Sequence, residues 1–150
     1  MNRKALWIFP GLLVLGIDRL VKMISMDTFY RRLIPGVLAL HPTRNTGMAL
    51  GLFQNRSYVI LAISVILVLL SIRFIRRIKP TGLAAASISM IAGGALGNMI
   101  DRLAYGYVID MFELLFVDFY IFNVADVGVV LGAILCFASL QFRPQDWRGQ

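Results

Sequence analysis

The sequence of 150 residues contains one cysteine, one histidine and few charged residues. A single cysteine excludes a disulfide within the chain and a cysteine-rich zinc site, and the lone His41 argues against a histidine-ligated metal. Charged residues form only 15% of the chain and hydrophobic residues 59%, whereas soluble domains have about 25% and about 45–50%. A soluble core of this size cannot bury so much apolar surface. The composition therefore excludes an ordinary soluble domain and predicts an integral membrane protein.

Apolar segments at about residues 5–24, 57–75, 81–100 and 123–142 are the candidate spans. A hydrocarbon core of roughly 30 Å needs about 20 helical residues, and lipid offers no partner for free backbone groups, so we expect helices. The first segment could instead be a cleavable signal peptide, but it ends without a small-x-small cleavage site. Because the sequence has no internal repeat, we expect one α-helical membrane domain over residues 1–150, with four transmembrane helices.

The net charge of +7 is compatible with binding to nucleic acid or with basic residues on the cytoplasmic side of a membrane. We expect basic residues on the cytoplasmic side and no binding to nucleic acid, because four basic residues cluster at 73–79, beside the end of a span. Both termini then share the cytoplasmic side, and the loop of about residues 25–56 lies on the outer side. Its short apolar runs at 33–40 and 48–53 are bounded by Pro, Gly and Asn, which predicts a small β-rich region.

The third span ends in a cluster of small and polar residues. Glycines within 93–97 allow close approach of another helix. Asn98, Asp101 and Arg102 follow at positions i, i+3 and i+4, which places an amide, a carboxylate and a guanidinium on one helical face. Asp101 and Arg102 form either a structural ion pair or part of a functional site.

Asp18 and Lys22 lie four residues apart near the end of the first span, so they face the same way. They form either an interfacial ion pair or part of a functional site, because ionisable residues at membrane depth are candidates for function. Together with Asp126 they could also form the proton relay of a small transporter. A membrane chaperone or assembly factor without hydrolytic activity is a further alternative.

Two more carboxylates lie near the outer face. Asp110 stands in an apolar run, and Asp126 opens the fourth span on the same helical face as Asn123. Two carboxylates brought together in a low dielectric share a proton, so one can activate water while the other polarises a carbonyl, as in an aspartic peptidase. Cys136 lies in mid-span, where a thiol is inert. Clustered acids could instead hold Mg²⁺ for phosphoryl or lipid-head-group transfer. These acids occur singly in the sequence, however, and no basic phosphate-binding loop adjoins them.

The sequence resembles the bacterial lipoprotein signal peptidases, the signal peptidase II family. The resemblance rests on five blocks in the family's order, spread over nearly the whole chain. They are Asp18 to Lys22 (Asp-x-x-x-Lys), Asn45 to Ala49 (Asn-Thr-Gly-x-Ala), Gly93 to Arg102 (Gly-Gly-Ala-x-Gly-Asn-x-x-Asp-Arg), Gly106 to Asp110 (Gly-x-Val-x-Asp) and Phe122 to Asp126 (Phe-Asn-x-Ala-Asp). The chain departs from the family pattern at Arg19, Leu50 and Val127, where Gln, an aromatic residue and Ser are common.

This resemblance implies an intramembrane aspartic endopeptidase of the bacterial inner membrane that acts near the outer face. Such enzymes remove the signal peptide from diacylglyceryl-modified prolipoproteins and cut just before the lipid-bearing cysteine. The catalytic dyad maps onto Asp110 and Asp126. The residues expected to support the site or bind substrate are Asp18, Lys22, Asn45, Asn98, Asp101, Arg102 and Asn123. We expect no metal and no cofactor, membrane lipid around the helices, and a monomer.

Overall fold

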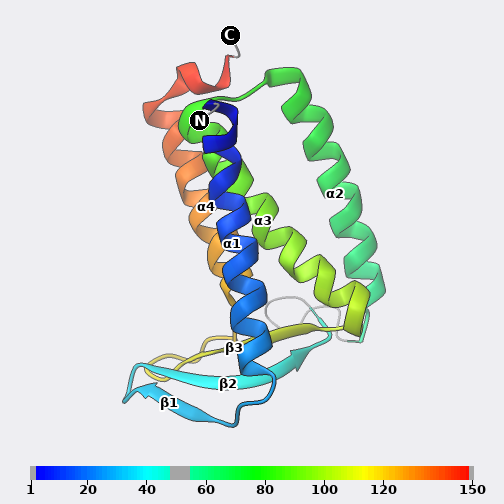
Figure 1. Cartoon of the computed structure of the whole chain (residues 1–150), viewed down its shortest axis with the longest axis vertical. Coiled ribbons are helices and arrows are strands. Elements are labelled where there is room, and N and C mark those ends of the chain that lie inside the picture. The colour runs from blue at the N-terminus through cyan, green and yellow to red at the C-terminus, as the bar shows by residue number, and fades with distance from the viewer. Residues whose placement is uncertain (1–2, 48–54, 149–150) are drawn as a thin grey trace.

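The computed structural model describes residues 3–47 and 55–148. Long helices lie side by side, a small sheet covers one end of them, and both ends of the chain lie at the other (Figure 1). The helices are α1 (Arg3–Ser25), α2 (Ser57–Ile78), α3 (Gly82–Tyr105) and α4 (Val124–Phe142), followed by the short 3-10 helix η2 (Pro144–Trp147). The strands are β1 (Arg31–Ile34), β2 (Leu38–Asn45) and β3 (Val108–Leu114).

The sheet is antiparallel with the order β1-β2-β3. The predicted strands within residues 33–40 are confirmed in part, since β1 and β2 overlap this run. The apolar run at 48–53 lies outside the described residues. The sequence analysis missed the third strand, which carries Asp110 and pairs with β2 at both of its ends, with an irregularity in the register between Leu40 and Thr43.

Helices occupy the four predicted segments, with one clear difference in length. The third was expected to end near residue 100, but α3 continues to Tyr105. The predicted apolar segment stops just before Asp101 and Arg102, but both residues are buried within the helix, at 0% and 8% exposure. Polar groups from neighbouring elements meet these charges, so the helix continues through them.

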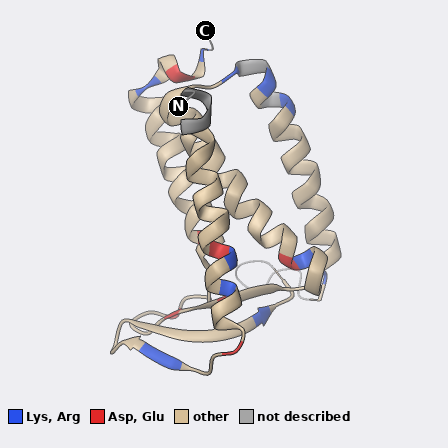
Figure 2. Cartoon of the chain, viewed as in Figure 1, with Lys and Arg blue, Asp and Glu red and all other residues tan. Residues whose placement is uncertain are grey.

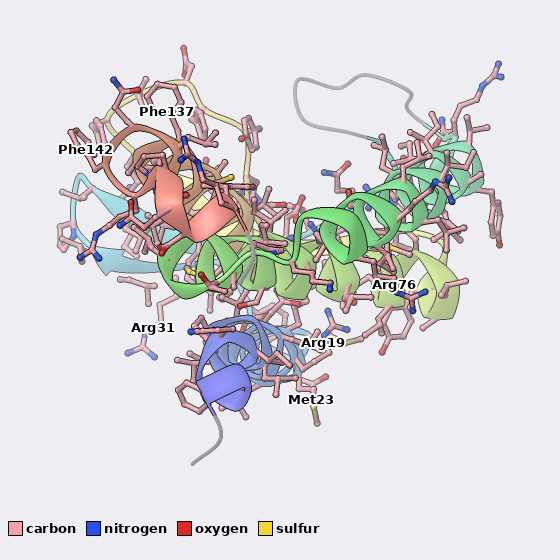
Figure 3. The ribbon with its side chains drawn as sticks, turned by 90° about the horizontal axis from the view of Figure 1, so that it is seen from above. Arg19, Met23, Arg31, Arg76, Phe137 and Phe142 are labelled. Atoms are coloured by element: carbon pink, nitrogen blue, oxygen red, sulfur yellow. The ribbon has the colours of Figure 1, made fainter. Side chains whose placement is uncertain are left out.

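The outer surface of the helices is largely apolar. Figure 2 shows charged residues near the two ends of the helices, with an uncharged belt between them. In the view along the helices, Met23, Phe137 and Phe142 point away from the bundle (Figure 3), and each is more than two-thirds exposed. Within the described ranges, α3 and α4 are each long and apolar enough to cross a membrane. The fold is thus mostly helical, with apolar side chains turned outward.

Helix α3 packs against both α1 and α4. Glycines line these contacts, as predicted for the third span: a Cβ on Gly93 would overlap the carbonyl oxygen of Gly11 in α1. A Cβ on Gly94 would similarly overlap the carbonyl oxygen of Ala125 in α4. Backbone contact of this kind is possible only where side chains are absent.

We therefore expect Gly93→Ala to destabilise the protein by about 1–3 kcal/mol, because the added methyl group forces the two helix backbones apart. Gly16→Ala is the matched control in α1, since nothing lies within 4 Å of its Cβ position. That variant should be neutral or stabilising by up to about 1 kcal/mol. Thermal unfolding in detergent micelles measures both. Equal stability of the two variants would contradict the close approach at Gly93.

Candidate active site

Asp110 is placed by the pairing of β3 with β2. Thr43 is its partner in the register, and Asn45 lies two residues further along the same strand. The Asn45 side chain donates Nδ2–H to Asp110 Oδ2 at 2.8 Å, and Asn123 donates Nδ2–H to Asp110 Oδ1 at 2.6 Å. The aspartate is only 2% exposed. Each of its oxygens therefore accepts a hydrogen bond from an amide, which fixes the orientation of the carboxyl group.

Asp126 is placed by the first turn of α4. Asn123 is the N-cap residue, and the two side chains form a capping box. The backbone N–H of Asp126 donates to Asn123 Oδ1 at 2.9 Å, and that of Asn123 donates to Asp126 Oδ2 at 3.1 Å. Asn98 donates Nδ2–H to Asp126 Oδ1 at 2.8 Å. The cap that starts the helix thus also holds the carboxylate.

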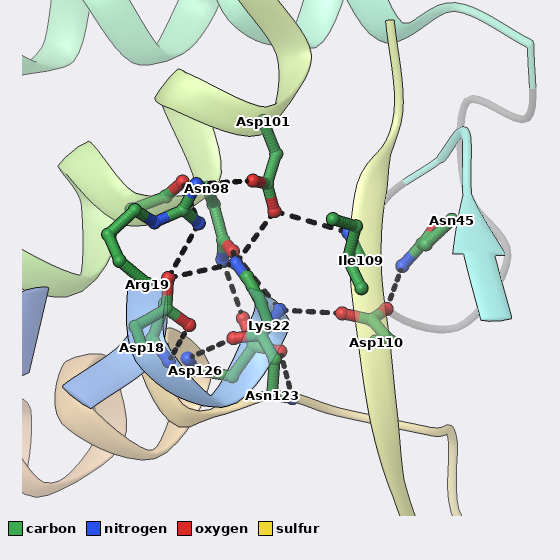
Figure 4. A network of polar contacts seen from close by, with 12 residues as sticks. Asp18, Arg19, Lys22, Asn45, Asn98, Asp101, Ile109, Asp110, Asn123 and Asp126 are labelled. Atoms are coloured by element: carbon green, nitrogen blue, oxygen red, sulfur yellow. Dashed lines mark hydrogen bonds and ion pairs between the residues drawn. The ribbon is translucent and has the colours of Figure 1, made fainter. Parts of the chain in front are cut away.

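The two aspartates belong to one hydrogen-bonded chain of side chains (Figure 4). Asn123 donates Nδ2–H both to Asp110 and to Asn98 Oδ1, the latter at 3.1 Å. Since Asn98 in turn donates to Asp126, two amides connect the carboxylates. The predicted proximity of Asp110 and Asp126 is therefore found in the structure.

Both carboxylates line a cavity of about 360 Å³. Its walls come from β2, β3, α2, α3 and α4, with Ile60 and Ser64 contributed by α2. Arg102 also lines this cavity and donates Nη2–H to the carbonyl oxygen of Gly47 at 3.1 Å. Its buried Nε–H has no hydrogen-bond partner among the described residues. The cavity therefore holds two acids and a guanidinium beside apolar walls.

Burial raises the pKa of the Asp110 carboxyl to about 6, and the nearby charge of Asp126 acts in the same direction. The hydrogen bonds from Asn45 and Asn123 oppose this shift. Because desolvation disfavours the charged form, Asp110 holds a proton at a higher pH than an exposed aspartate does.

We expect the infrared band of a protonated carboxyl to disappear as the pH rises through about 6, and this titration to be absent from Asp110→Asn. The pKa of Asp110 is higher in the folded protein than in the unfolded chain. Protonation of Asp110 therefore favours the folded state: this contribution to stability is complete below about pH 4 and is lost as the pH rises through about 6. Unfolding free energies should therefore depend less on pH in Asp110→Asn over this interval. Absence of a wild-type titration near pH 6, or its persistence unchanged in Asp110→Asn, would contradict the burial argument.

A second cluster of charges lies beside the two aspartates, between α1 and α3. Lys22 is 1% exposed and its Nζ lies 3.0 Å from Asp18 Oδ2, 2.7 Å from Asp101 Oδ2 and 3.0 Å from Asn98 Oδ1. Arg19 contacts the same two carboxylates, at 2.8 Å from Asp18 and 2.7 Å from Asp101. The predicted i,i+4 ion pair is confirmed. It belongs to a cluster of four charges in which Asp18, Lys22 and Asp101 are buried and the Arg19 side chain is 26% exposed.

Asp101 and Arg102 are not partners of each other in this arrangement. Asp101 contacts Arg19 and Lys22 of α1, whereas Arg102 contacts the backbone of Gly47. Adjacent residues of a helix point about 100° apart, which lets each reach a different element.

All nine predicted site residues lie in this connected region, and sequence analysis missed Arg19. Its charge within an apolar helix, directly after Asp18, was the available signal. Within residues 3–47 and 55–148, no three His, Cys, Asp or Glu side chains are grouped as metal ligands. The chain also departs from the family pattern at Val127 and Leu50. Val127 is 39% exposed on α4, and Leu50 lies outside the described residues.

Comparison with known proteins places this arrangement in a family. A family described as signal peptidase (SPase) II matches residues 11–142. The chain belongs to the signal peptidase II family. Lipoprotein signal peptidase of Lactobacillus johnsonii is 35% identical over 145 residues, covering 93% of this chain and 94% of that relative. The same enzyme of Clostridioides difficile is 32% identical, covering 94% and 99%.

Two solved structures of bacterial membrane enzymes share this fold. A bacterial membrane enzyme superposes with a TM-score of 0.84 at 28% identity, covering 91% of this chain and 88% of that one. A second such structure gives a TM-score of 0.82 at 28% identity, covering 93% and 94%. The helices and the small sheet are therefore the fold of a bacterial membrane enzyme, and the signal peptidase II family makes the protein a peptidase.

Proposed function

We propose that this signal peptidase II is an aspartic endopeptidase whose dyad is Asp110 and Asp126. The family supports removal of the signal peptide from prolipoproteins. The observation that carries the catalytic type is that both carboxylates line one cavity and are linked by the amides of Asn98 and Asn123. The cut falls before the lipid-modified cysteine of the precursor.

The reaction needs one ionised and one protonated carboxyl group. The ionised aspartate takes a proton from water, and the resulting hydroxide attacks the scissile carbonyl carbon. The protonated aspartate donates its proton to the carbonyl oxygen. Collapse of the tetrahedral intermediate breaks the C–N bond. The proton taken from water passes to the leaving amine, and one hydroxyl proton of the intermediate returns to the other aspartate, which restores the starting state of the pair. We treat Asp110 and Asp126 as one titrating pair, because their charges interact.

Several polar groups are available to hold the substrate. The guanidinium of Arg102 lines the cavity and has an unused donor among the described residues, so it suits a substrate carbonyl oxygen. Asn45, Asn98 and Asn123 already donate to the dyad and hold its orientation. These amides keep the two carboxyl groups in place while water and substrate exchange.

The apolar surroundings suit a lipid-modified substrate. A second, apolar pocket of about 210 Å³ shares Asp126 with the polar cavity. Its apolar lining includes Leu114, Phe119, Phe122, Val127, Val130 and Leu131. We propose that the precursor enters laterally from the bilayer and that its acyl chains lie along such apolar faces beside Asp126.

The same proposal includes four spans and a site at the outer face of the bacterial inner membrane. α1 and α2 have 23 and 22 residues, long enough to cross a bilayer beside α3 and α4. The ends of the chain lie at the same end of the bundle as the basic end of α2 (Figure 2). Positive loops stay in the cytoplasm, so the sheet and the dyad face outward. The site is drawn from a single chain, which suits a monomer.

The test is cleavage of a synthetic diacylglyceryl-modified prolipoprotein peptide by the purified protein in detergent. We expect a cut directly before the lipid-bearing cysteine, located by mass spectrometry, and little cleavage of the same peptide without lipid. Absence of cleavage by folded protein would reject the peptidase. Equal cleavage of both peptides would reject the lipid requirement, and proton flux without proteolysis would favour the transporter instead.

A further inference from the structure

We propose that Arg19 is a positioning residue that sets the relative placement of Asp110 and Asp126, acting through Asp18 and Asp101. This inference rests on the proposed dyad. Arg19 itself lines neither of the two pockets beside Asp126. Its effect is therefore indirect, through two buried carboxylates that hold the backbone next to each member of the dyad.

Each of the two supporting carboxylates accepts a hydrogen bond from the backbone N–H of the residue that precedes a dyad residue. Asp18 Oδ1 accepts the N–H of Ala125 at 3.0 Å, one residue before Asp126. Asp101 Oδ2 accepts the N–H of Ile109 at 3.2 Å, one residue before Asp110. Asp18 and Asp101 are both fully buried. The positions of these two carboxylates therefore determine where α4 and β3 present their aspartates.

Arg19 joins the two carboxylates directly. Its Nη2 lies 2.8 Å from Asp18 Oδ2 and its Nη1 lies 2.7 Å from Asp101 Oδ1, while Nη2–H also donates to the carbonyl oxygen of Gly97 at 3.0 Å. A guanidinium is planar and rigid, so contacts through two of its nitrogens fix the separation of the acids as well as attracting them. Figure 4 shows Arg19 between Asp18 and Asp101, beside the hydrogen-bonded side chains that connect Asp110 with Asp126.

Lys22 bridges the same acids, but it cannot replace the guanidinium. Its ammonium group is a single point that also contacts Asn98. With Lys22 alone, two carboxylates would face one positive charge, and Arg19 balances the cluster at two against two. The carboxylate of Asp18 also fits closely against α3, since a Cβ on Gly97 would lie 2.7 Å from Asp18 Oδ2. The helix contact and the bridge thus support each other.

The alternative is that Arg19 only strengthens the packing of α1 against α3. Such a role lowers stability when Arg19 is replaced, but leaves the folded enzyme's turnover unchanged. A positioning role lowers kcat in folded enzyme, because misplacement of reacting groups by about 1 Å costs roughly 100-fold. It leaves KM nearly unchanged, since no substrate contact is removed.

The experiment compares Arg19→Met, Arg19→Lys and the control Arg73→Met, a change at an exposed arginine of α2 outside the site. Activity is measured on the lipid-modified peptide, normalised to folded protein. We expect Arg19→Met, which removes every donor of the bridge, to lower kcat roughly 10- to 100-fold with KM within about 2-fold. Arg19→Lys keeps the charge without the planar fork, so its kcat should be intermediate, and Arg73→Met should match wild type.

Amide hydrogen exchange gives a second measurement that needs no turnover. In Arg19→Met, exchange should become faster in the peptides covering 108–110 and 124–126, and not in the middle of α4. The proposal would be overturned by wild-type kcat in Arg19→Met, by a loss of activity that follows only the unfolded fraction, or by unchanged exchange at both segments. Failure of the dyad itself is distinguished by cleavage that survives in Asp126→Asn, and the exchange data still decide whether Arg19 places the two backbones.

Discussion

Asp110→Asn and Asp126→Asn should each lower kcat/KM on the lipid-modified peptide by at least about 10³-fold. General acid–base catalysis contributes about 10²- to 10⁴-fold, and in this mechanism each step needs the base and the acid together. An asparagine can neither take a proton from water nor donate one to the carbonyl oxygen. The effect should appear in kcat, because the shape of the site is nearly preserved.

The control for these variants is Asp118→Asn, an exposed acid in the segment between β3 and α4. It should retain wild-type activity. The double variant Asp110→Asn/Asp126→Asn should be little worse than either single variant, because removing one member already disables the pair. Substantial cleavage by either single variant would reject the dyad.

Folding must be checked in these variants for a specific reason. Both oxygens of Asp110 accept hydrogen bonds from amide N–H groups, of Asn45 and Asn123. An asparagine there offers one oxygen and one NH₂ group, so one of the two donors loses its acceptor. The expected cost is about 1–3 kcal/mol for a buried unsatisfied group. Activity is therefore normalised to folded protein.

The sequence was most informative where chemistry is concentrated in short motifs. Spacing placed Asp18 and Lys22 on one helix face, and the structure confirms their contact. The spacing of Asn123 and Asp126 corresponds to the capping box at the start of α4. Both are local relations within one turn of helix, which periodicity determines without knowledge of the tertiary fold.

Long-range pairing was beyond such reasoning. The strand β3 reads Val-Ile-Asp-Met-Phe-Glu-Leu, without the alternation typical of a half-exposed strand. It forms because β2, more than 60 residues earlier, pairs with it from Leu38 to Asn45. The extension of α3 past Ile100 has a similar cause: Asp101 is neutralised by Lys22 and Arg19 of α1. Neither partner can be inferred from the neighbouring sequence.

The same reason explains why Arg19 was treated as a departure from the family pattern and not as a site residue. Its sequence neighbour Asp18 is one contact, but its other partners lie 78 and 82 residues away, at Gly97 and Asp101. Family motifs describe which residue is common at a position. They do not say what a different residue contacts in this chain.

The largest expected change in stability follows from Lys22→Met. Lys22 is 1% exposed, and its ammonium group lies between the fully buried carboxylates of Asp18 and Asp101. Methionine has a similar length but no charge, so Arg19 alone would then face both acids. Removing one partner of a buried ion pair costs about 3–5 kcal/mol, because the remaining charge stays desolvated. Unfolding of the purified protein in detergent micelles measures this loss.

The double variant Lys22→Met/Asp101→Asn separates charge imbalance from lost packing. It leaves Asp18 and Arg19 as a balanced pair, so it should be more stable than Lys22→Met, although it carries one more substitution. Its activity should nevertheless stay low. An Asn side chain at 101 cannot bind Arg19 as a carboxylate does, so the segment before Asp110 loses its support. A double variant less stable than Lys22→Met would show that packing, and not the balance of buried charge, determines stability at this site.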